Sequence, residues 1–145
     1  MSSSRLVLLA SLAAVTLTGC VTSYEGRSIE EPVSIGEVCV IRNDAVRPGY
    51  VLPSIQRAFA KRNIATKVCT ESTANGCQFI LRYTARQSWD FTPYLKSARL
   101  DLYQGARLIA NSELYVYPYN LSKWSGEEER IEKLVDDLFE KAAAR

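Results

Sequence analysis

The sequence predicts an α+β domain, a two-layer sandwich in which a five-stranded mixed sheet carries two helices on one face. Two segments, near residues 53–63 and 125–142, have the apolar spacing of amphipathic helices. Between them, three consecutive segments alternate apolar and polar residues with a period of two, which is typical of an antiparallel sheet covered on one side. The predicted order of elements is β-α-β-β-β-β-α.

The first half of the domain is expected to be a strand–helix–strand unit. Residues 37–42 form a short apolar run rich in β-branched residues and predict the first strand. Pro53 suits the first position of a helix, because its missing N–H would be unbonded there anyway, and Asn63 is a suitable stop. Residues 64–70 predict a second strand. A unit of this size favours parallel pairing with a right-handed crossover.

Three alternating strands follow, over residues 78–89, 94–103 and 107–117, with a tight turn at 104–106. Each has one apolar face, expected to pack under the helices. The members of these faces are Phe79, Leu81, Tyr83, Ala85, Ala98, Leu100, Leu102, Leu108, Ala110, Leu114 and Val116.

The last helix has clear start signals. Ser125 as N-cap and Glu128 three residues later match a capping box, and the acidic run 127–129 suits the positive end of the helix dipole. The apolar stripe that follows predicts a helix packed on the sheet. Its members are Ile131, Leu134, Val135, Leu138, Phe139 and Ala142.

A lipobox ends the first apolar segment of the chain. Leu17-Thr-Gly-Cys20 comes one residue after the segment 6–15, whose length suits a secretory h-region and is too short to span a bilayer. Cleavage before Cys20 would leave that residue to carry acyl chains such as palmitate. The alternative is an ordinary cleaved signal with Cys20 near the cut by chance. We therefore expect a signal peptide over 1–19, a lipidated tether over 20–36 and one globular domain over 37–145.

The resemblance of this segment to Gram-negative lipoproteins implies a location. In such proteins an Asp after the lipidated cysteine usually retains the chain at the inner membrane, whereas here that residue is Val21. The expected location is the periplasmic face of the outer membrane, with the inner membrane as the alternative. The lipid bilayer, reached through acylated Cys20, is thus an expected partner.

Three cysteines remain in the mature chain, and an oxidising periplasm favours pairing of two of them. Cys69 and Cys77 flank a turn-like stretch and could close a hairpin, whereas a bridge from Cys39 to Cys77 would close a longer loop and stabilise more. One bridge involving Cys77 is expected. No metal site is expected, because the chain lacks both a close C-x-x-C spacing and histidine.

Composition argues against several kinds of chemistry. The 145 residues contain no histidine, so a Ser-His-Asp or Cys-His arrangement is impossible. No glycine-rich phosphate loop is present, and the acids at 127–129 and 136–137 are explained by helix capping and solvation. Basic and acidic side chains nearly balance, at 18 and 16, so attraction to nucleic acid is not built into the surface. We expect neither a cofactor nor an enzymatic activity.

Aromatic residues form the candidate binding surface. One group lies between the predicted third and fourth strands, and another lies opposite the apolar face of the last strand. Tyr and Trp are common in binding hot spots. The alternative is that these rings cover the second face of the sheet or pack on the core. The candidate residues are Trp89, Phe91, Tyr94, Tyr115, Tyr117 and Tyr119, with Trp124 just beyond.

Several motifs resemble the Sbal-type lipoproteins, a family of small Gram-negative (proteobacterial) lipoproteins of uncharacterised function, over about residues 37–140. The matching stretches are Val38-Cys-Val-Ile-Arg-Asn43, Arg47-Pro-Gly49, Cys77, Tyr83-Thr-Ala85, Ser88-Trp-Asp90 and Asn120-Leu-Ser-Lys123. The resemblance implies a Cys39–Cys77 bridge with Cys69 as an additional thiol, and it implies no catalytic residue.

The expected function is a non-enzymatic, lipid-anchored periplasmic module that binds another component of the cell envelope, with a protein as the expected partner. Two alternatives come from other classes. One is a structural or envelope-stress lipoprotein without a dedicated ligand. The other is an enzyme that acts on envelope glycans or peptides.

Overall fold

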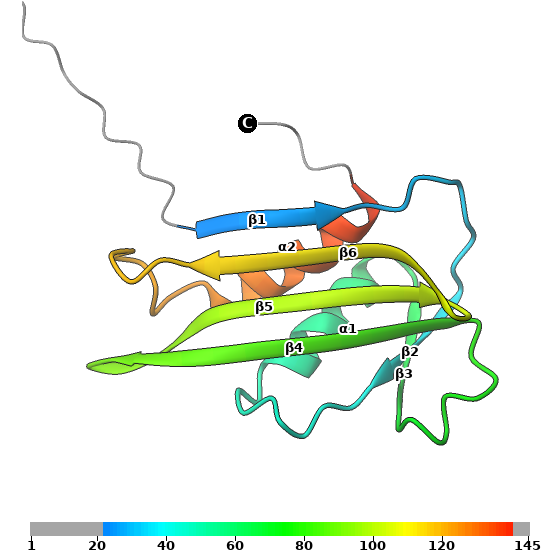
Figure 1. The fold of residues 1–145 in the computed structure, drawn as a ribbon, viewed down its shortest axis with the longest axis horizontal. Helices are drawn as coiled ribbons and strands as arrows, with labels where there is room; N and C mark the ends of the chain where they lie inside the picture. Colours follow the sequence, from blue (N-terminus) through cyan, green and yellow to red (C-terminus); the bar gives the residue numbers. More distant parts are fainter. Residues whose placement is uncertain (1–21, 141–145) are drawn as a thin grey trace, which may run out of the picture.

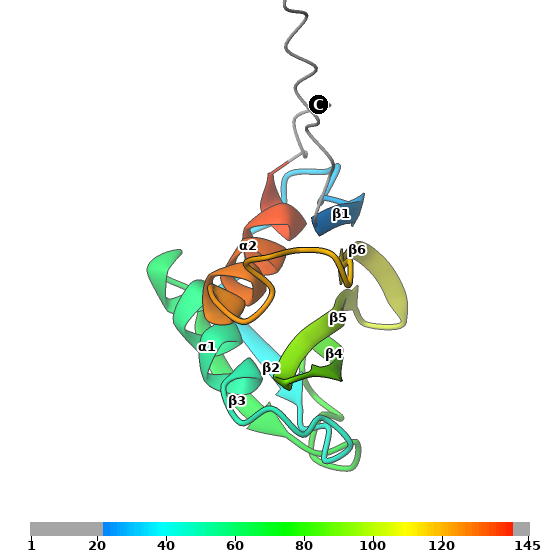
Figure 2. The same cartoon turned by 90° about the vertical axis from the view of Figure 1, so that its left-hand side faces the viewer.

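The computed structural model describes residues 22–140, so the signal peptide, Cys20, Val21 and Ala142 lie outside the described residues. A six-stranded mixed sheet carries both helices on one face (Figure 1, Figure 2). Its strand order is β1-β6-β5-β4-β2-β3. The elements are β1 (Thr22–Arg27), β2 (Glu37–Ile41), α1 (Val51–Lys61), β3 (Ala65–Cys69), β4 (Phe79–Asp90), β5 (Thr92–Gln104), β6 (Arg107–Val116) and α2 (Glu127–Phe139).

The α+β class and the two helices are confirmed, but the prediction of five strands is wrong. The additional strand, β1, lies inside the segment 20–36 that we expected to be a tether. It pairs antiparallel with β6, from Thr22 opposite Val116 to Arg27 opposite Asn111. As an edge strand with little of its surface in the core, β1 needs no alternation of apolar residues. It is held largely by backbone pairing, which the sequence pattern does not report.

The predicted pairing of the other strands is confirmed. β2 lies parallel to both β3 and β4, and β4, β5 and β6 form an antiparallel meander. The core lies between this sheet and the helices, where Leu81, Leu100 and Leu114 are fully buried. Leu108 is an exception to the predicted faces. It pairs with Tyr103 while Ala110 pairs with Leu102, so a bulge at the start of β6 places Leu108 on the opposite face from Ala110.

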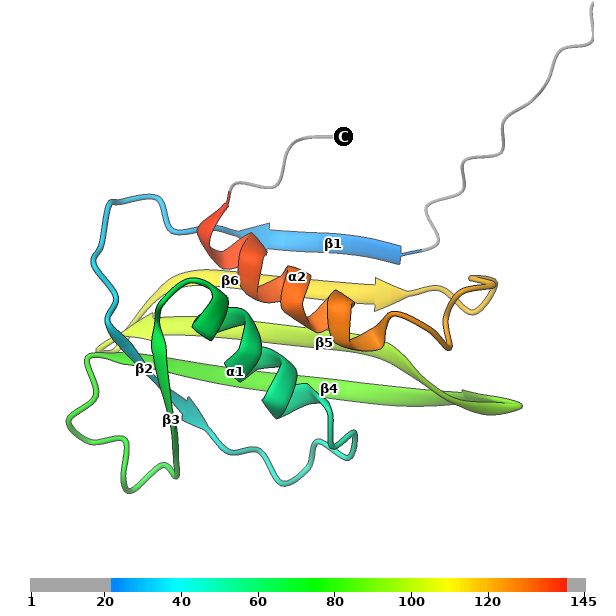
Figure 3. The same cartoon turned by 180° about the vertical axis from the view of Figure 1, so that it is seen from behind.

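The helices cross the sheet side by side, as seen from behind in Figure 3. α1 begins two residues before Pro53 and buries Ile55 and Phe59. α2 begins as expected, but Ser125 is not its N-cap. That position belongs to Gly126, whose φ of 68° is left-handed, and the Ser125 hydroxyl instead donates to the carbonyl of Ser122 at 3.2 Å. The left-handed Gly126 leads the chain into the helix, and the Ser125 hydroxyl is bonded to the preceding loop in place of the helix amides.

Within residues 22–140, neither helix combines the length and the apolar content that a membrane-spanning helix requires.

Candidate functional site

The β4–β5 hairpin tip (87–93) and the β6–α2 loop (117–125) lie at one end of the molecule, beside the start of β1 (Figure 1). Exposed apolar side chains gather on these two loops. We call the five residues involved the aromatic end. Of the large apolar side chains in the described part of the chain, only Val68 is comparably exposed elsewhere, at 40%. The aromatic end consists of Trp89 (70% exposed), Phe91 (87%), Tyr119 (63%), Leu121 (91%) and Trp124 (42%).

Phe91 occupies the tip of the hairpin in a conformation that aromatic residues rarely adopt. Asp90 pairs with Thr92, so Phe91 alone reverses the chain between β4 and β5, with a φ of 60°. A bulky residue in this left-handed region is strained, and glycine or asparagine is the usual occupant. Its ring is nevertheless almost entirely in solvent. Strained backbone of this kind is found most often at functional sites, so Phe91 is a candidate functional residue.

Lys123 joins the two loops from a buried position. Its side chain is 6% exposed, and its ammonium group contacts both the Asp90 carboxylate and the Pro118 carbonyl. The same group lies 5.2 Å from the ring centre of Tyr94 and 4.6 Å from that of Trp124. The indole N–H of Trp124 donates to the Asp90 carbonyl at 3.0 Å. The hairpin tip and the β6–α2 loop therefore form one unit, in which the buried charge has its counter-ion.

Asn120 connects this unit to the start of the described chain. It is 2% exposed, and its amide nitrogen donates to the Thr22 hydroxyl at 3.0 Å. Its side-chain oxygen accepts from both the backbone N–H and the hydroxyl of Ser122, each at 2.8 Å. The first residue of β1 is thus held against the aromatic end.

The six candidate residues from the sequence fall into different environments. Trp89, Phe91 and Tyr119 belong to the aromatic end. Tyr94, by contrast, is a core residue with only 3% of its surface exposed, beneath Lys123. Tyr94 therefore does not belong to an exposed binding surface. Its distance in sequence from Phe91 does not reveal this, because the burial of Tyr94 depends on Lys123, which comes from the distant β6–α2 loop.

Tyr115 and Tyr117 lie half-buried on the face of the sheet opposite the helices. The rings of Tyr115 and Tyr117 meet edge to face with centres 5.0 Å apart, and those of Tyr117 and Tyr119 stack at 5.4 Å. This row of rings connects the aromatic end to the open face of the sheet. These two residues cover part of the second face of the sheet, as the alternative interpretation expected, and they also adjoin the exposed Tyr119.

Leu121 and the roles of Lys123 and Asn120 were not predicted from the sequence. Leu121 stands alone among polar residues and has no periodic pattern to mark it. One available signal was composition, since residues 87–93 and 117–125 contain only one charged side chain each, Asp90 and Lys123.

The open face beyond the tyrosines is charged and internally paired. Arg99 contacts Asp101 at 2.9 Å and Glu113 at 3.6 Å. Arg82 forms a bidentate ion pair with Glu71. The hydrogen bond from Arg82 lowers the pKa of the Glu71 carboxyl below its ordinary value. The Glu71 carboxylate is thus held ionised by Arg82, an arrangement that does not favour proton transfer near neutral pH.

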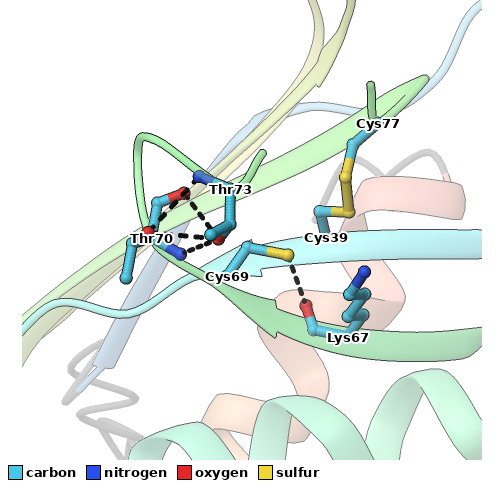
Figure 4. Close-up of a disulfide and its surroundings, with 6 residues drawn as sticks. All are labelled: Cys39, Lys67, Cys69, Thr70, Thr73 and Cys77. Carbon is cyan, nitrogen blue, oxygen red and sulfur yellow. Dashed lines mark hydrogen bonds between the residues drawn. A yellow bond between two sulfur atoms is a disulfide. The ribbon is translucent and has the colours of Figure 1, made fainter. Parts of the chain in front are cut away.

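The disulfide joins Cys39 of β2 to Cys77, just before β4, with the Cα atoms 6.2 Å apart (Figure 4). Of the two pairings considered from the sequence, the structure contains the one that closes the longer loop. Cys69 is a buried free thiol whose sulfur lies 3.6 Å from the Lys67 carbonyl. The three sulfurs lie within 4.8 Å of one another. Two of them are bonded together, so they do not offer the three thiolates of a metal site.

Two hollows on the described surface lie away from the aromatic end. One, of about 510 Å³, lies between the β1–β2 connection and the β5–β6 hairpin, and Arg27, Glu31 and Arg107 are among its lining residues. Another, of about 790 Å³, is lined in part by Asp44 and Arg82. Both have charged rims and contrast with the apolar surface of the aromatic end.

No family model matches the chain, and no curated protein matches it significantly. Solved structures do match the chain. A point variant of the PelC dodecamer from Paraburkholderia phytofirmans matches with a TM-score of 0.59 at 10% identity, covering 81% of this chain and 99% of that one. PelC in a second crystal form gives 0.55 at 9% identity, covering 81% and 94%. A minor lipoprotein from Acinetobacter baumannii gives 0.31 at 11% identity, covering 74% and 87%.

At these identities the likeness to PelC shows a shared fold and nothing about activity. The TM-score of the Acinetobacter protein is too low to support an argument. The resemblance to Sbal-type lipoproteins stays an expectation from the sequence motifs.

Proposed function

We propose that this chain is a lipid-anchored, non-enzymatic binding module of the cell envelope, which contacts its partner through the aromatic end. One observation carries the proposal. Five exposed apolar side chains gather where the described chain begins, two residues after the cysteine of the lipobox. Scattered exposed apolar residues are normal, whereas a contiguous group marks a contact surface.

Physical chemistry favours binding over catalysis at this surface. Removing apolar area from water contributes about 25 cal/mol per Å², so large exposed side chains such as Trp89 and Phe91 can stabilise a complex substantially. Lys123 and Asp90, the charged residues of the two loops, neutralise each other. A general acid or base needs a proton that it can exchange with a substrate, and this pair is engaged internally.

The lipobox supports the location of the module. Acylation of Cys20 would hold the domain at a bilayer, and Val21 supports the periplasmic face of the outer membrane over the inner membrane. The disulfide is in keeping with an oxidising compartment.

Co-sedimentation with isolated cell envelopes tests the binding function. The mature chain with Cys20→Ser, which cannot be acylated, is expected to sediment with envelopes through its aromatic end alone. Replacing Trp89 and Phe91 by Ser removes two of its most exposed apolar side chains and should lower the bound fraction several-fold. The matched control is Val68→Ser, which removes an exposed apolar side chain elsewhere and should leave binding unchanged.

Two outcomes would count against the proposal. Binding that is unaffected by the Trp89 and Phe91 substitutions would assign the contact to another surface. No binding by any form would favour a structural lipoprotein without a dedicated ligand.

Self-assembly is a second candidate, because both PelC structures are dodecamers. The edge strands β1 and β3 each have a neighbour on one side only, which leaves backbone groups available to another copy. Sedimentation velocity of the acylated protein in detergent is expected to show a species heavier than one chain. A single species with the mass of one chain would contradict this candidate.

A further inference from the structure

We infer that the aromatic end lies in the interfacial region of the bilayer that holds the lipid anchor, so that its partner is the lipid surface itself. This inference rests on the proposed function, and in particular on acylation of Cys20. It assigns an orientation to the whole domain, with the long axis of the sheet pointing away from the membrane.

Chain length places the anchor next to this surface. Cys20 precedes Thr22 by two residues, and two residues span at most about 7 Å. Thr22 pairs with Val116 at the end of β6 and bonds to Asn120 in the following loop. An acyl group on Cys20 therefore brings the aromatic end, before any other part of the described structure, to the bilayer surface.

The two loops have the composition of an interfacial segment. Of the whole chain 23% is charged, whereas residues 87–93 and 117–125 contain only Asp90 and Lys123. These two pair with each other, so the loops can approach the acyl region without exposing an unpaired charge to it. Trp and Tyr are the side chains preferred at membrane interfaces, and Trp89, Trp124 and Tyr119 supply them.

Phe91 and Leu121 suit the deepest positions. They are the most exposed large apolar residues of the described chain, at 87% and 91%, and each projects from a loop. Such side chains can enter the headgroup–acyl boundary, about 5–10 Å deep, without a rigid matching surface. A protein interface of standard size uses roughly 20–30 residues a side, far more than these five. The protruding shape therefore favours lipid over protein as the occupant.

The opposite end of the sheet has the reverse character. There the β1–β2 connection carries Glu30 and Glu31, and Arg107 of the β5–β6 hairpin lies 3.6 Å from Glu31. The β1–β2 connection and the β5–β6 hairpin lie at the opposite end of the strands from the β4–β5 hairpin tip (Figure 1). The domain is thus polarised along its strands, apolar beside the start of β1 and charged at the far end. This asymmetry suits a domain whose strands point away from the membrane, because the apolar end can contact lipid while the charged end stays in water.

Tryptophan fluorescence tests the orientation directly, because both tryptophans of the chain, Trp89 and Trp124, belong to the aromatic end. The acylated mature protein is reconstituted into vesicles of phosphatidylethanolamine and phosphatidylglycerol. A fraction of these lipid molecules carries bromine on the acyl chain, near the headgroup. Bromine quenches only rings that reach it. We expect about a two-fold loss of tryptophan emission, and a blue shift relative to detergent-free solution, because interfacial rings sit at that depth.

The control variant places its tryptophan far from the aromatic end and keeps the acylated Cys20 unchanged. Val68 of β3 pairs with Val40 of β2, and Val40 pairs with Leu81 of β4. Leu81 comes eight residues before Trp89 on β4. At about 3.3 Å per residue, this level lies about 26 Å from Trp89 along the strand. A Val68→Trp chain that also carries Trp89→Phe and Trp124→Phe should show no quenching. If this variant does not fold, as judged by circular dichroism, protection of the native tryptophans from acrylamide in vesicles replaces it.

The outcomes separate this inference from the proposed function. Unquenched tryptophans in the acylated protein, still open to acrylamide, would overturn the membrane orientation. If binding to envelopes still depended on Trp89 and Phe91, the proposed function would stand with a protein as its partner. If neither quenching nor envelope binding depended on these residues, both proposals would fail.

Discussion

At the scale of single residues, Gly26 decides whether β1 can join the sheet. Its φ is 146°, and a Cβ built on it would lie 2.1 Å from the Asn111 carbonyl oxygen and 2.8 Å from the Ser112 Cα. Both obstacles are backbone atoms, which cannot rotate away as a side chain can. Glycine is therefore required for the close approach of β1 to β6. Because Thr22 begins the same strand, Gly26 also helps to hold the chain start beside the aromatic end.

Replacing Gly26 by Ala is expected to lower the free energy of unfolding by about 1–3 kcal/mol and to detach β1, because the added methyl group collides with β6. Urea unfolding measures the first effect, and hydrogen exchange of the β1 amides measures the second. The matched control is Gly36→Ala, since no atom lies within 4 Å of the position its Cβ would take. That variant should change stability by no more than about 0.5 kcal/mol. Equal effects of the two changes would refute the role assigned to Gly26.

At the scale of elements, ion pairs join the solvent sides of α1 and α2. Glu132 of α2 contacts both Lys61 and the Arg57 Nε atom, the latter at 2.8 Å. Arg62 contacts Asp136 at 3.0 Å and Glu140 at 2.6 Å. The Glu132 side chain is only 17% exposed. The hydrogen bond from Lys61, and then that from Arg57, lowers the pKa of the Glu132 carboxyl below its ordinary value of 4.5.

A pKa lowered by folding means that Glu132 stabilises the domain when ionised. This contribution is complete above pH 4.5 and is lost as the pH falls through the lowered value in the folded state. We expect Glu132→Gln to destabilise the domain by about 1 kcal/mol at neutral pH, and by progressively less in acid. Urea unfolding of both proteins at a series of pH values measures the difference. A constant difference across the acid range would show that Glu132 acts by packing, and Glu129→Gln on the same helix serves as an exposed control.

At the scale of the whole molecule, the sheet has a core on each side. The larger one lies between the sheet and the two helices. The smaller one lies on the opposite face at the β2–β3 side, where Cys39, Ile41, Cys69 and Ala74 are buried together. The disulfide closes this second core, because it ties the segment before β4 to β2. Without it, the connection from β3 to β4 would be held over the sheet by few apolar contacts.

Replacing Cys39 and Cys77 together by Ser is expected to lower the free energy of unfolding by about 4 kcal/mol, because the chain-entropy model assigns that value to a loop of this length, a separation of 38 residues. The measurement is thermal or urea unfolding of the oxidised proteins. Cys69→Ala keeps the bridge and should cost about 1 kcal/mol, the effect of one small cavity. A double variant no less stable than Cys69→Ala would contradict this account.

Periodicity in the sequence predicts the helices and the long strands well. It predicts edge pairing and the burial of residues beside turns less well. The alternation of β4 and β5 correctly separates Leu81 and Leu100 from their exposed neighbours, because a side-chain period of two is a local property of a strand. β1 escapes prediction because edge pairing needs no apolar pattern. Tyr94 and Trp89 have similar residue types and similar places beside a turn, yet one is buried and the other exposed. Only the position of Lys123, from a distant loop, explains the difference.

The sequence by itself determined the α+β class, the two helices and, apart from Leu108 at the bulge of β6, the face that each long strand turns to the core, since these depend on repeats within single segments. The tertiary structure alone decided that residues 87–93, residues 117–125 and Thr22 meet at one end. The physical reason is that neighbouring strands bring together chain segments far apart in sequence, and strand order is set by the packing of the whole sheet. The candidate site exists only through that long-range pairing.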